Sequence, residues 1–356
     1  MENHLHIRPG VFFNYSLVLT FFNILLSFQL SAQEAEPVKL VKSSHAKSVD
    51  IFIGPSLFTR FIYPDSLEKP VLFPIYSAGN TPITRGFPKE PRPGEPTDHP
   101  HHIGLWLTYE NVNNIDFWNN SYAIPAEKKS SYGWIKVDRP PELTSGRTGT
   151  LTYHAGWVNQ KGDILLEETT RYEFSGHSGE RIINRETTLK AMVDISFTDA
   201  KDGMLGLRLA HELQVPASQD QFFTDDKGNK TLVKKDLVPT GNYLTSAGKQ
   251  GDSAWGTRAA WCKVFGKMGS DSVSITIFDH PGNPNYPTFW HARGYGLFAA
   301  NPLGEKVFTS GKSEFNLKLN KGQSVVFRYR ILVQNGQTTP GRNYLDEMFV
   351  SLENEK

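Results

Sequence analysis

Two short windows of this sequence concentrate side chains that can transfer protons. An Asp-His-Pro triplet stands at residues 98–100 and again at residues 279–281. Beyond residue 32 the chain has nine histidines, and five of them fall in or beside these windows: His99, His101, His102, His280 and His291. Imidazole titrates near neutral pH, so this clustering indicates acid–base chemistry or metal ligation more than packing.

The proline in each triplet predicts the backbone conformation of the histidine before it. A residue that precedes proline favours extended backbone, so we expect His99 and His280 to be extended. In an extended run His99 and His101 point to one side of the chain and His102 points to the other. Two imidazoles of the first window would then converge, and His102 is either a substrate contact or a packed core residue.

The second window adds hydrogen-bonding and aromatic side chains after its triplet. His291 and Arg293 share a face if this segment is extended, and Arg293 can bind an anion or an oxyanion. Aromatic rings next to polar groups commonly hold sugars, although tryptophans of a sandwich equally suit its core. The residues predicted to bind substrate are Asp98, His102, Trp106, Asn283, Tyr286, Trp290 and Tyr295.

Carboxylates offer partners for these histidines. Glu212 lies on the polar face of a strand predicted over residues 205–213, and a pair of carboxylates flanking a bond would suit glycoside hydrolysis. Asp98 and Asp279 have an equally good structural explanation, because aspartate before His-Pro caps a turn with its side chain.

Metal binding is an alternative use of the same histidines. His99 and His101, with His280 or His291 as a third ligand, could hold a divalent zinc or copper ion. The sequence contains no His-Glu-x-x-His motif, Walker loop, Gly-x-Ser-x-Gly elbow or dinucleotide fingerprint. We therefore predict no cofactor and keep a metal at the histidine cluster as the alternative.

Alternating apolar residues predict that strands must position these groups. The pattern appears in residues 187–198, 205–213, 273–277 and 324–333, and residues 151–174 form a hairpin pattern around 160–163. Only the tail, near residues 344–352, has helical spacing, and the proline-rich stretch 86–97 suits a surface loop. The fold class predicted is all-β: a large antiparallel β-sandwich with little helix.

The chain divides into a leader and one folding unit. An apolar run at residues 12–30 ends in Leu-Ser-Ala-Gln, which predicts a signal peptide at 1–32 and a periplasmic or secreted protein; an uncleaved anchor is the alternative. We expect a polar lead-in at 33–48 and a single domain at 49–356. With one cysteine no intramolecular disulfide can form, and 38 Lys+Arg against 37 Asp+Glu give no basic surface for nucleic acid.

Both windows resemble one bacterial family. The motif DHPHHxGLW with Asp-Phe-Trp at 116–118, and FDHPxNPxYPxxWHxRxYGLFAxNP at 278–302, are similar to exported proteins labelled "methane oxygenase PmoA". The resemblance covers most of residues 50–335 and implies a galactose-mutarotase-like sandwich (a supersandwich) in which histidines and an acid move protons on a sugar. Ile103 stands where the family usually has arginine. Methane oxidation does not fit, since that enzyme subunit is a bundle of membrane helices.

These observations predict an exported carbohydrate-active enzyme that hydrolyses, eliminates or isomerises a glycoside or modified sugar. We assign proton transfer to His101 and His291, charge stabilisation to Arg293 and His280, an orienting or ligand role to His99, and the carboxylate role to Glu212. The partner is a small molecule or oligosaccharide. A non-catalytic sugar-binding protein and a metal-dependent oxygenase or hydrolase are the alternatives.

Overall fold

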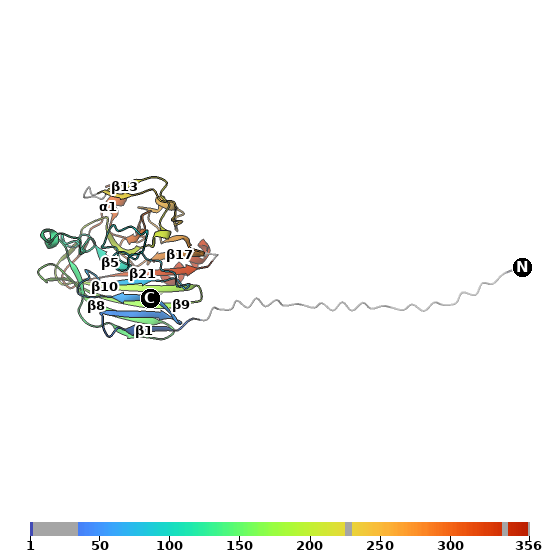
Figure 1. Ribbon diagram of the computed structural model, residues 1–356, viewed down its shortest axis with the longest axis horizontal. Helices are drawn as coiled ribbons and strands as arrows, with labels where there is room; N and C mark the ends of the chain where they lie inside the picture. The colour runs from blue at the N-terminus through green and yellow to red at the C-terminus, as the bar shows by residue number, and fades with distance from the viewer. Residues whose placement is uncertain (3–34, 225–229, 337–340, 355–356) are drawn as a thin grey trace. The chain divides into compact units, whose positions relative to one another are not determined.

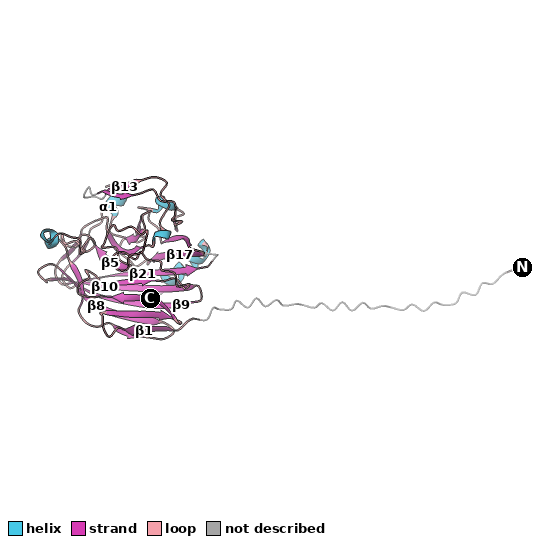
Figure 2. Cartoon of the chain, viewed as in Figure 1, coloured by secondary structure: helices cyan, strands magenta, loops and turns pink. Residues whose placement is uncertain are grey.

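The computed structural model describes residues 1–2, 35–224, 230–336 and 341–354. Apart from its first two residues, the predicted signal peptide lies outside the described residues, as do residues 33–34 of the predicted lead-in. Strands dominate the described part of the chain, as the magenta arrows in Figure 2 show. None of its helices is long and apolar enough to cross a membrane.

Two large antiparallel sheets form a β-sandwich, which confirms the predicted fold class. In spatial order the eight-stranded sheet contains β1 (Val38–Lys42), β2 (Ser48–Ile53), β3 (Ser56–Ile62), β4 (Val71–Ile75), β5 (Leu105–Tyr109), β12 (Gly203–Arg208), β19 (Leu297–Asn301) and β18 (Phe289–Ala292). The nine-stranded sheet contains β15 (Asn242–Thr245), β16 (Trp261–Met268), β17 (Asp271–Asp279), β21 (Ser324–Asn335), β10 (Glu180–Ala191), β9 (Ile164–His177), β8 (Gly149–Val158) and β6 (Trp134–Val137), with β7 (Glu142–Thr144) also paired to β8.

Smaller elements complete the fold. Two short pairs join β11 (Ile195–Phe197) to β20 (Leu317–Leu319) and β13 (Gln221–Thr224) to β14 (Lys230–Val233). The helical elements are α1 (Glu305–Phe308), α2 (Arg342–Glu353) and the 3-10 turns η1 (Ala126–Ser131), η2 (His211–Leu213) and η3 (Gly251–Ala254). The predicted tail helix is α2, and its Leu345 and Leu352 pack with Trp261, Phe278 and Leu332 of the nine-stranded sheet.

Period-two alternation forms the core between the sheets. Leu205 and Leu207 of β12 are fully buried there together with Ile331 and Val333 of β21, from the opposite sheet. Figure 1 shows the long strands β8, β9, β10 and β21 side by side, and the first two are the hairpin predicted from residues 151–174. The alternate residues of each strand must then point away from this core, which creates an outer face on each sheet.

Some predicted boundaries differ from the structure. Strand β1 lies inside the predicted lead-in, because Val38 is buried and the strand pairs along its length with β2. Strand β12 ends at Arg208, so residues 211–213 form the turn η2 rather than the end of a strand. Val193 is exposed between β10 and β11, so the predicted strand 187–198 is in fact the end of one strand, a bend and a second strand.

A charged network lies inside the sandwich on the inner face of the nine-stranded sheet. Glu168 and Arg185 form an ion pair of 3.1 Å in which both side chains are 1% exposed. The carboxylate of Glu168 also accepts hydrogen bonds from Tyr153, Thr170 and the Trp157 indole at 2.5, 2.6 and 2.7 Å. A polar atom that is buried away from water needs a hydrogen-bond partner inside the protein. The network supplies these partners, so we interpret it as part of the structural core.

Candidate functional site

The strand register places the two sequence windows on one outer face. In the eight-stranded sheet Trp106 of β5 is paired with Gly206 of β12, which is paired with Ala299 of β19, which is paired with His291 of β18. Neighbours of Trp106 on β5, such as Leu105 and Leu107, belong to the inter-sheet core, so this row faces outward. A tryptophan and a histidine thus stand at the ends of a row whose centre carries only small residues.

Gly206 is required in this row because the Trp106 ring lies over it. A Cβ atom at position 206 would lie 2.5 Å from Cζ2 of Trp106 and 2.8 Å from the Trp118 ring. We expect Gly206→Ala to lower the free energy of unfolding by about 1–3 kcal/mol through overpacking, measured by urea denaturation. Gly146→Ala is the control, since its Cβ would meet the Thr148 carbonyl oxygen at 3.6 Å. Equal losses in both variants would contradict this account of the row.

The first Asp-His-Pro triplet opens a tight turn. The His102 amide donates to the His99 carbonyl oxygen at 3.0 Å, and His99 has φ of 45°. Arg85 holds the turn by donating to the carbonyl oxygens of His99 and His102 at 2.9 and 3.2 Å. The prediction that His99 is extended is therefore wrong, because these bonds to the turn outweigh the conformational bias of a residue before proline.

This turn gathers all three histidines, which the sequence reasoning had divided between two faces. The His99 ring stacks on His102 with centroids 4.9 Å apart, and His101 lies edge-on to His102 at 4.3 Å. On its other side His99 stacks on Tyr295 at 5.4 Å, while His102 stacks on Trp106 at 5.2 Å. Tyr295 belongs to the second window, so the two windows meet in one column of rings.

Asp98 is the carboxylate of this site. Its Oδ1 accepts hydrogen bonds from Arg85 at 3.0 Å and from Arg208 at 2.9 Å, and both guanidinium groups are completely buried. Burial by itself would raise the pKa of Asp98, but the positive charge of Arg208, the His99 hydrogen bond and Arg85 hold that pKa well below its usual range. Asp98 therefore stays ionised at neutral pH.

The Asp98 carboxylate orients the ring of His99. Its Oδ2 is hydrogen-bonded to Nδ1 of His99, so Nδ1 carries the proton and Nε2 is left with a lone pair. The His99 side chain is 24% exposed, and among the described residues Nε2 has no hydrogen-bond partner. Burial lowers the pKa of His99 and the bond to Asp98 raises it, with burial the larger effect. A neutral imidazole oriented by an aspartate is suited to accept a proton.

His102 is buried and locked as a hydrogen-bond acceptor. Arg208 lies 3.2 Å from its Nδ1, and guanidinium can only donate, so Nδ1 carries no proton and Nε2 does. Burial, together with His101, His99 and Arg208, holds the pKa of His102 well below 6.5. Protonation would break the bond from Arg208 and bring two positive charges together.

Neutral His102 makes the fold sensitive to acid. At a pH between the folded-state pKa of His102 and 6.5, this histidine is protonated in the unfolded chain and neutral in the folded chain. The stability that neutral His102 contributes is therefore complete above pH 6.5 and is lost as the pH falls below 6.5. The slope for one group is about 1.4 kcal/mol per pH unit. We expect the difference in unfolding free energy between wild type and His102→Gln to shrink at that rate between pH 6 and pH 5, measured by urea denaturation at each pH. A difference that stays constant would exclude a neutral His102.

His291 lies in the same site, where its Nε2 accepts a hydrogen bond and its buried Nδ1 makes none within the described part of the chain. Arg293 donates from Nε to Nε2 of His291 at 3.2 Å, and Nδ1 faces Oδ1 of Asp202 at 3.5 Å. Burial, then the charges of Arg293 and Lys201, hold the pKa of His291 well below 6.5. Arg293 also lies over the Trp255 ring at 4.4 Å. This geometry favours His291 as the group that positions Arg293, in place of the proton-transfer role predicted for it.

Several residues of the site were missed by the sequence reasoning. Lys69 is buried, donates to the Trp118 carbonyl oxygen at 3.1 Å and lies over the Trp106 ring at 5.3 Å. Burial lowers the pKa of Lys69 to about 8. The others are Arg85, Arg208, Asp202 and Lys201. Arg208 did give a signal, because it stands on the polar side of an alternating strand.

The second Asp-His-Pro triplet forms a turn at a different place. The Asn283 amide donates to the His280 carbonyl oxygen at 2.9 Å, and Asn283 Nδ2 donates to Asp279 and to the Arg328 carbonyl oxygen, each at 2.7 Å. The turn follows β17 of the nine-stranded sheet. His280 lines a cavity of about 380 Å³ on the outer face of that sheet, with Arg171, Glu173, Asn184, Arg185, Glu186, Arg328, Tyr329 and Leu352.

His280, Asn283 and Tyr286 therefore leave the proposed site, because the sandwich core separates the two outer faces. Tyr286 stacks on Phe349 of α2 at 6.4 Å. Burial raises the pKa of Asp279 to about 7, and this side chain accepts the Thr288 amide at 2.8 Å. The turn-capping explanation holds for Asp279, whereas Asp98 belongs to the histidine site.

For three further residues the structure differs from the role that the sequence predicted. Trp290 points into the inter-sheet core, where its indole donates to the Ala259 carbonyl oxygen at 3.0 Å, so it has no free ring face for a sugar. Trp106 is also 0% exposed and supports the ring column from below. Glu212 is exposed on η2, and Asp98 and Asp202 take its place beside the histidines. Ile103 is packed among Trp106, Trp118 and Leu297.

Of the two candidate third ligands for a metal ion, His280 and His291, the first lies away from the histidine cluster. His280 lies on the other sheet and cannot join His99 and His101. Within the described ranges, no group of three or more histidine, cysteine, aspartate or glutamate side chains is arranged to hold a metal ion.

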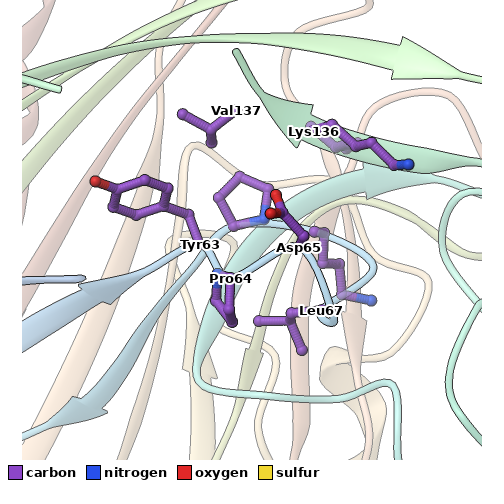
Figure 3. Close-up of a pocket in the computed structure, with 9 residues that line it drawn as sticks. Tyr63, Pro64, Asp65, Leu67, Lys136 and Val137 are labelled. Atoms are coloured by element: carbon purple, nitrogen blue, oxygen red, sulfur yellow. The ribbon is translucent and has the colours of Figure 1, made fainter. Parts of the chain in front are cut away.

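Two other hollows lie on the surface. Figure 3 shows a depression where Tyr63, Pro64, Asp65 and Leu67 face Lys136 and Val137 of β6, and its cavity volume is about 0 Å³. A cavity of about 350 Å³ has an acidic lining that includes Glu110, Asp116 and Asp199. Neither contains a histidine.

Comparison with solved structures finds weak similarity to sugar enzymes. An α-galactosidase from Geobacillus stearothermophilus is 11% identical with a TM-score of 0.41, covering 84% of this chain and 41% of its own. An α-galactosidase from Lactobacillus brevis is 12% identical with a TM-score of 0.38, covering 88% of this chain and 41% of its own. An Escherichia coli K12 protein provisionally named an aldose 1-epimerase is 9% identical with a TM-score of 0.33, covering 84% and 99%. Such values transfer no activity, and this chain spans less than half of either α-galactosidase.

The fold and the site define a two-sheet antiparallel β-sandwich with a charged histidine cluster on one outer face. Residues 48–344 match the model of DUF6807, a family of unknown function, and the chain belongs to this family. No curated protein matches it. The family description names no activity, so it does not support the methane label that the resemblance carried.

Proposed function

We propose that this protein is an exported carbohydrate-active enzyme that uses acid–base catalysis on a glycoside or a modified sugar. The observation that carries the proposal is the pair formed by Asp98 and His99. An ionised carboxylate, itself only partly exposed, orients an equally exposed imidazole whose Nε2 is left as the acceptor. This is the arrangement that general bases require.

The neighbouring groups divide the remaining work. His99 takes the proton and Asp98 fixes its tautomer and stabilises the imidazolium that forms. Nε2 of His101 is buried without a hydrogen-bond partner, and its ring lies 5.6 Å from His99, so His101 can supply a second proton-transfer group once substrate is bound. Arg293, which donates a hydrogen bond to His291, is a half-buried cation whose charge acts on Tyr295, the residue that stacks on His99. Cations preorganised in this way stabilise negative charge that develops in a transition state.

The alternatives have less support. A non-catalytic binding protein needs ring faces open to a sugar, and Trp106 and Trp290 are both fully buried. A metal-dependent enzyme would need ligands beyond His99 and His101, and His280 is on the other sheet. The chemistry that we favour is hydrolysis, elimination or isomerisation, each of which begins with proton transfer.

The proposal is tested by incubating the purified protein with panels of glycosides, glycans and oxidised or acidic sugars, with products followed by NMR and mass spectrometry. We expect turnover of at least one sugar by wild type and none by His99→Asn. If no panel member is converted while sugars bind, the protein is a binding module and the catalytic proposal is wrong.

A further inference from the structure

We infer that the cavity on the outer face of the nine-stranded sheet is a second binding site, and that it takes a neutral, polyhydroxylated ligand such as a sugar chain. Its volume of about 380 Å³ lies within the range of about 300–1,000 Å³ that is usual for small-molecule sites. The cavity shares no lining residue with the histidine cluster, which lies on the other sheet. The inference therefore does not depend on the proposed function.

Six polar side chains form the accessible lining of this cavity. Tyr329 and Leu352 also line it, but both are almost completely buried in hydrophobic clusters. Arg185 is buried in its ion pair with Glu168 inside the sandwich. The remaining lining residues are Arg171, Glu173, Asn184, Glu186, Arg328 and His280. A ligand that displaces water from such a lining must offer hydrogen bonds in its place.

The strand register alternates charge across the cavity. On the outer face of the sheet, Arg171 of β9 is paired with Glu186 of β10, which is paired with Arg328 of β21. Arg328 donates from Nε to the Glu186 carboxylate at 2.6 Å, and Glu173 forms an ion pair with Arg171. All four side chains are partly exposed. The charges of the accessible lining therefore sum to zero.

The second Asp-His-Pro turn holds His280 next to Arg328. The Asn283 amide ties the turn to β21, because it donates to the Arg328 carbonyl oxygen and accepts from the Arg328 amide, each at 2.7 Å. A Cβ atom at Gly282 would lie 3.1 Å from Nδ1 of His280 and 3.8 Å from a terminal nitrogen of Arg328, so both rings of atoms approach one glycine. Nδ1 of His280 accepts from the Gly282 amide at 2.9 Å, so His280 is neutral.

The donors and acceptors of this lining match the hydroxyl groups of a sugar. A guanidinium group can only donate and a carboxylate can only accept, whereas a hydroxyl group does both. Neighbouring hydroxyl groups can accept from Arg328 and donate to Glu186, and the same holds at Arg171 and Glu173. Hydrogen bonds to ionised groups are stronger than those between neutral groups. An anionic or a cationic ligand would instead meet a charge of its own sign in each pair.

Neutral trisaccharides test the inference. The probes are maltotriose, cellotriose, xylotriose and mannotriose, with binding to the purified protein detected by ligand-observed NMR and the Kd measured by titration calorimetry. We expect at least one probe to bind, with a Kd that changes by less than about twofold between low and high salt, because salt screens interactions between charged partners. If none of the four binds, the inference is wrong.

Variants locate the binding. Arg328→Gln and Glu186→Gln should each raise the Kd about tenfold through the loss of a charge-assisted hydrogen bond. Glu167→Gln is the matched control, since Glu167 pairs with Lys190 on the same two strands and does not line the cavity. Thermal melts show whether each variant is folded. An equal change in Glu167→Gln would contradict the assignment to this cavity.

His99→Asn separates this site from the histidine cluster. We expect this variant to bind the trisaccharide as tightly as wild type does. Binding that His99→Asn abolishes and Arg328→Gln leaves intact would place the sugar at the histidine cluster, which overturns the inference and leaves the proposed function intact. If Arg328→Gln and Glu186→Gln weaken binding while the sugar panels show no turnover, the second site is supported and the proposed catalysis is wrong.

Discussion

Replacing Glu168 with alanine is expected to lower the free energy of unfolding by about 3–5 kcal/mol, because it leaves a buried charge without its partner. Arg185 would keep its guanidinium inside the sandwich with no carboxylate, and the hydrogen bonds donated by Tyr153 and Trp157 would lose their acceptor. Urea or guanidinium denaturation followed by tryptophan fluorescence measures this loss.

The neighbouring residue provides a matched control. Glu167 is half-exposed on the outer side of the same strand, and its carboxylate lies 3.7 Å from Lys190. Glu167→Ala should change the free energy of unfolding by less than about 1 kcal/mol, since exposed ion pairs contribute little. Similar losses for both variants would contradict the assignment of the Glu168 network as the polar unit that the core depends on.

Replacing His99 with asparagine is expected to lower kcat/KM by about 10²–10⁴-fold, the contribution usual for a general base or acid. Asparagine cannot take a proton at neutral pH, and it also breaks the ring column between Tyr295 and His102. The measurement is turnover of whichever sugar the panels identify, together with the pH profile of kcat/KM.

Two comparisons make this result specific. His154→Asn is the control, because the His154 side chain is hydrogen-bonded to Thr169 on the nine-stranded sheet, away from the ring column. Asp98→Asn should also reduce activity, since the amide no longer stabilises an imidazolium, and it should shift the acidic limb of the pH profile as the pKa of His99 falls. If His99→Asn keeps wild-type kcat/KM while folded, His99 is not the base.

The fold was more predictable than the site. Period-two alternation in residues 324–333 and 151–174 identified strands that the structure contains as β21, β8 and β9, because a sandwich strand must bury every second side chain. The predicted strand boundaries were wrong in places. At Arg208, for example, the chain leaves the sheet and the turn η2 follows.

The residue types of the site were visible, but their partners were not. The three histidines of the first window do cluster in space, and the first window does meet the second at Tyr295. The prediction for His280 failed because the triplet does not encode which sheet its turn belongs to, and this turn follows β17 of the nine-stranded sheet. Both triplets do form turns, yet one turn follows a strand of the nine-stranded sheet and the other precedes a strand of the eight-stranded sheet.

The sequence by itself determined that this chain folds as a strand-rich sandwich and that five of its histidines concentrate in two short windows, because periodicity and residue type are local properties. Only the tertiary structure decided which imidazole nitrogens are already hydrogen-bonded to neighbouring side chains. Arg208 donates a hydrogen bond to Nδ1 of His102, Arg293 donates one to Nε2 of His291, and Asp98 leaves Nε2 of His99 as an acceptor. Arg208 comes from β12, 110 positions from Asp98, and hydrogen bonds between such distant segments have no signature in the order of residues.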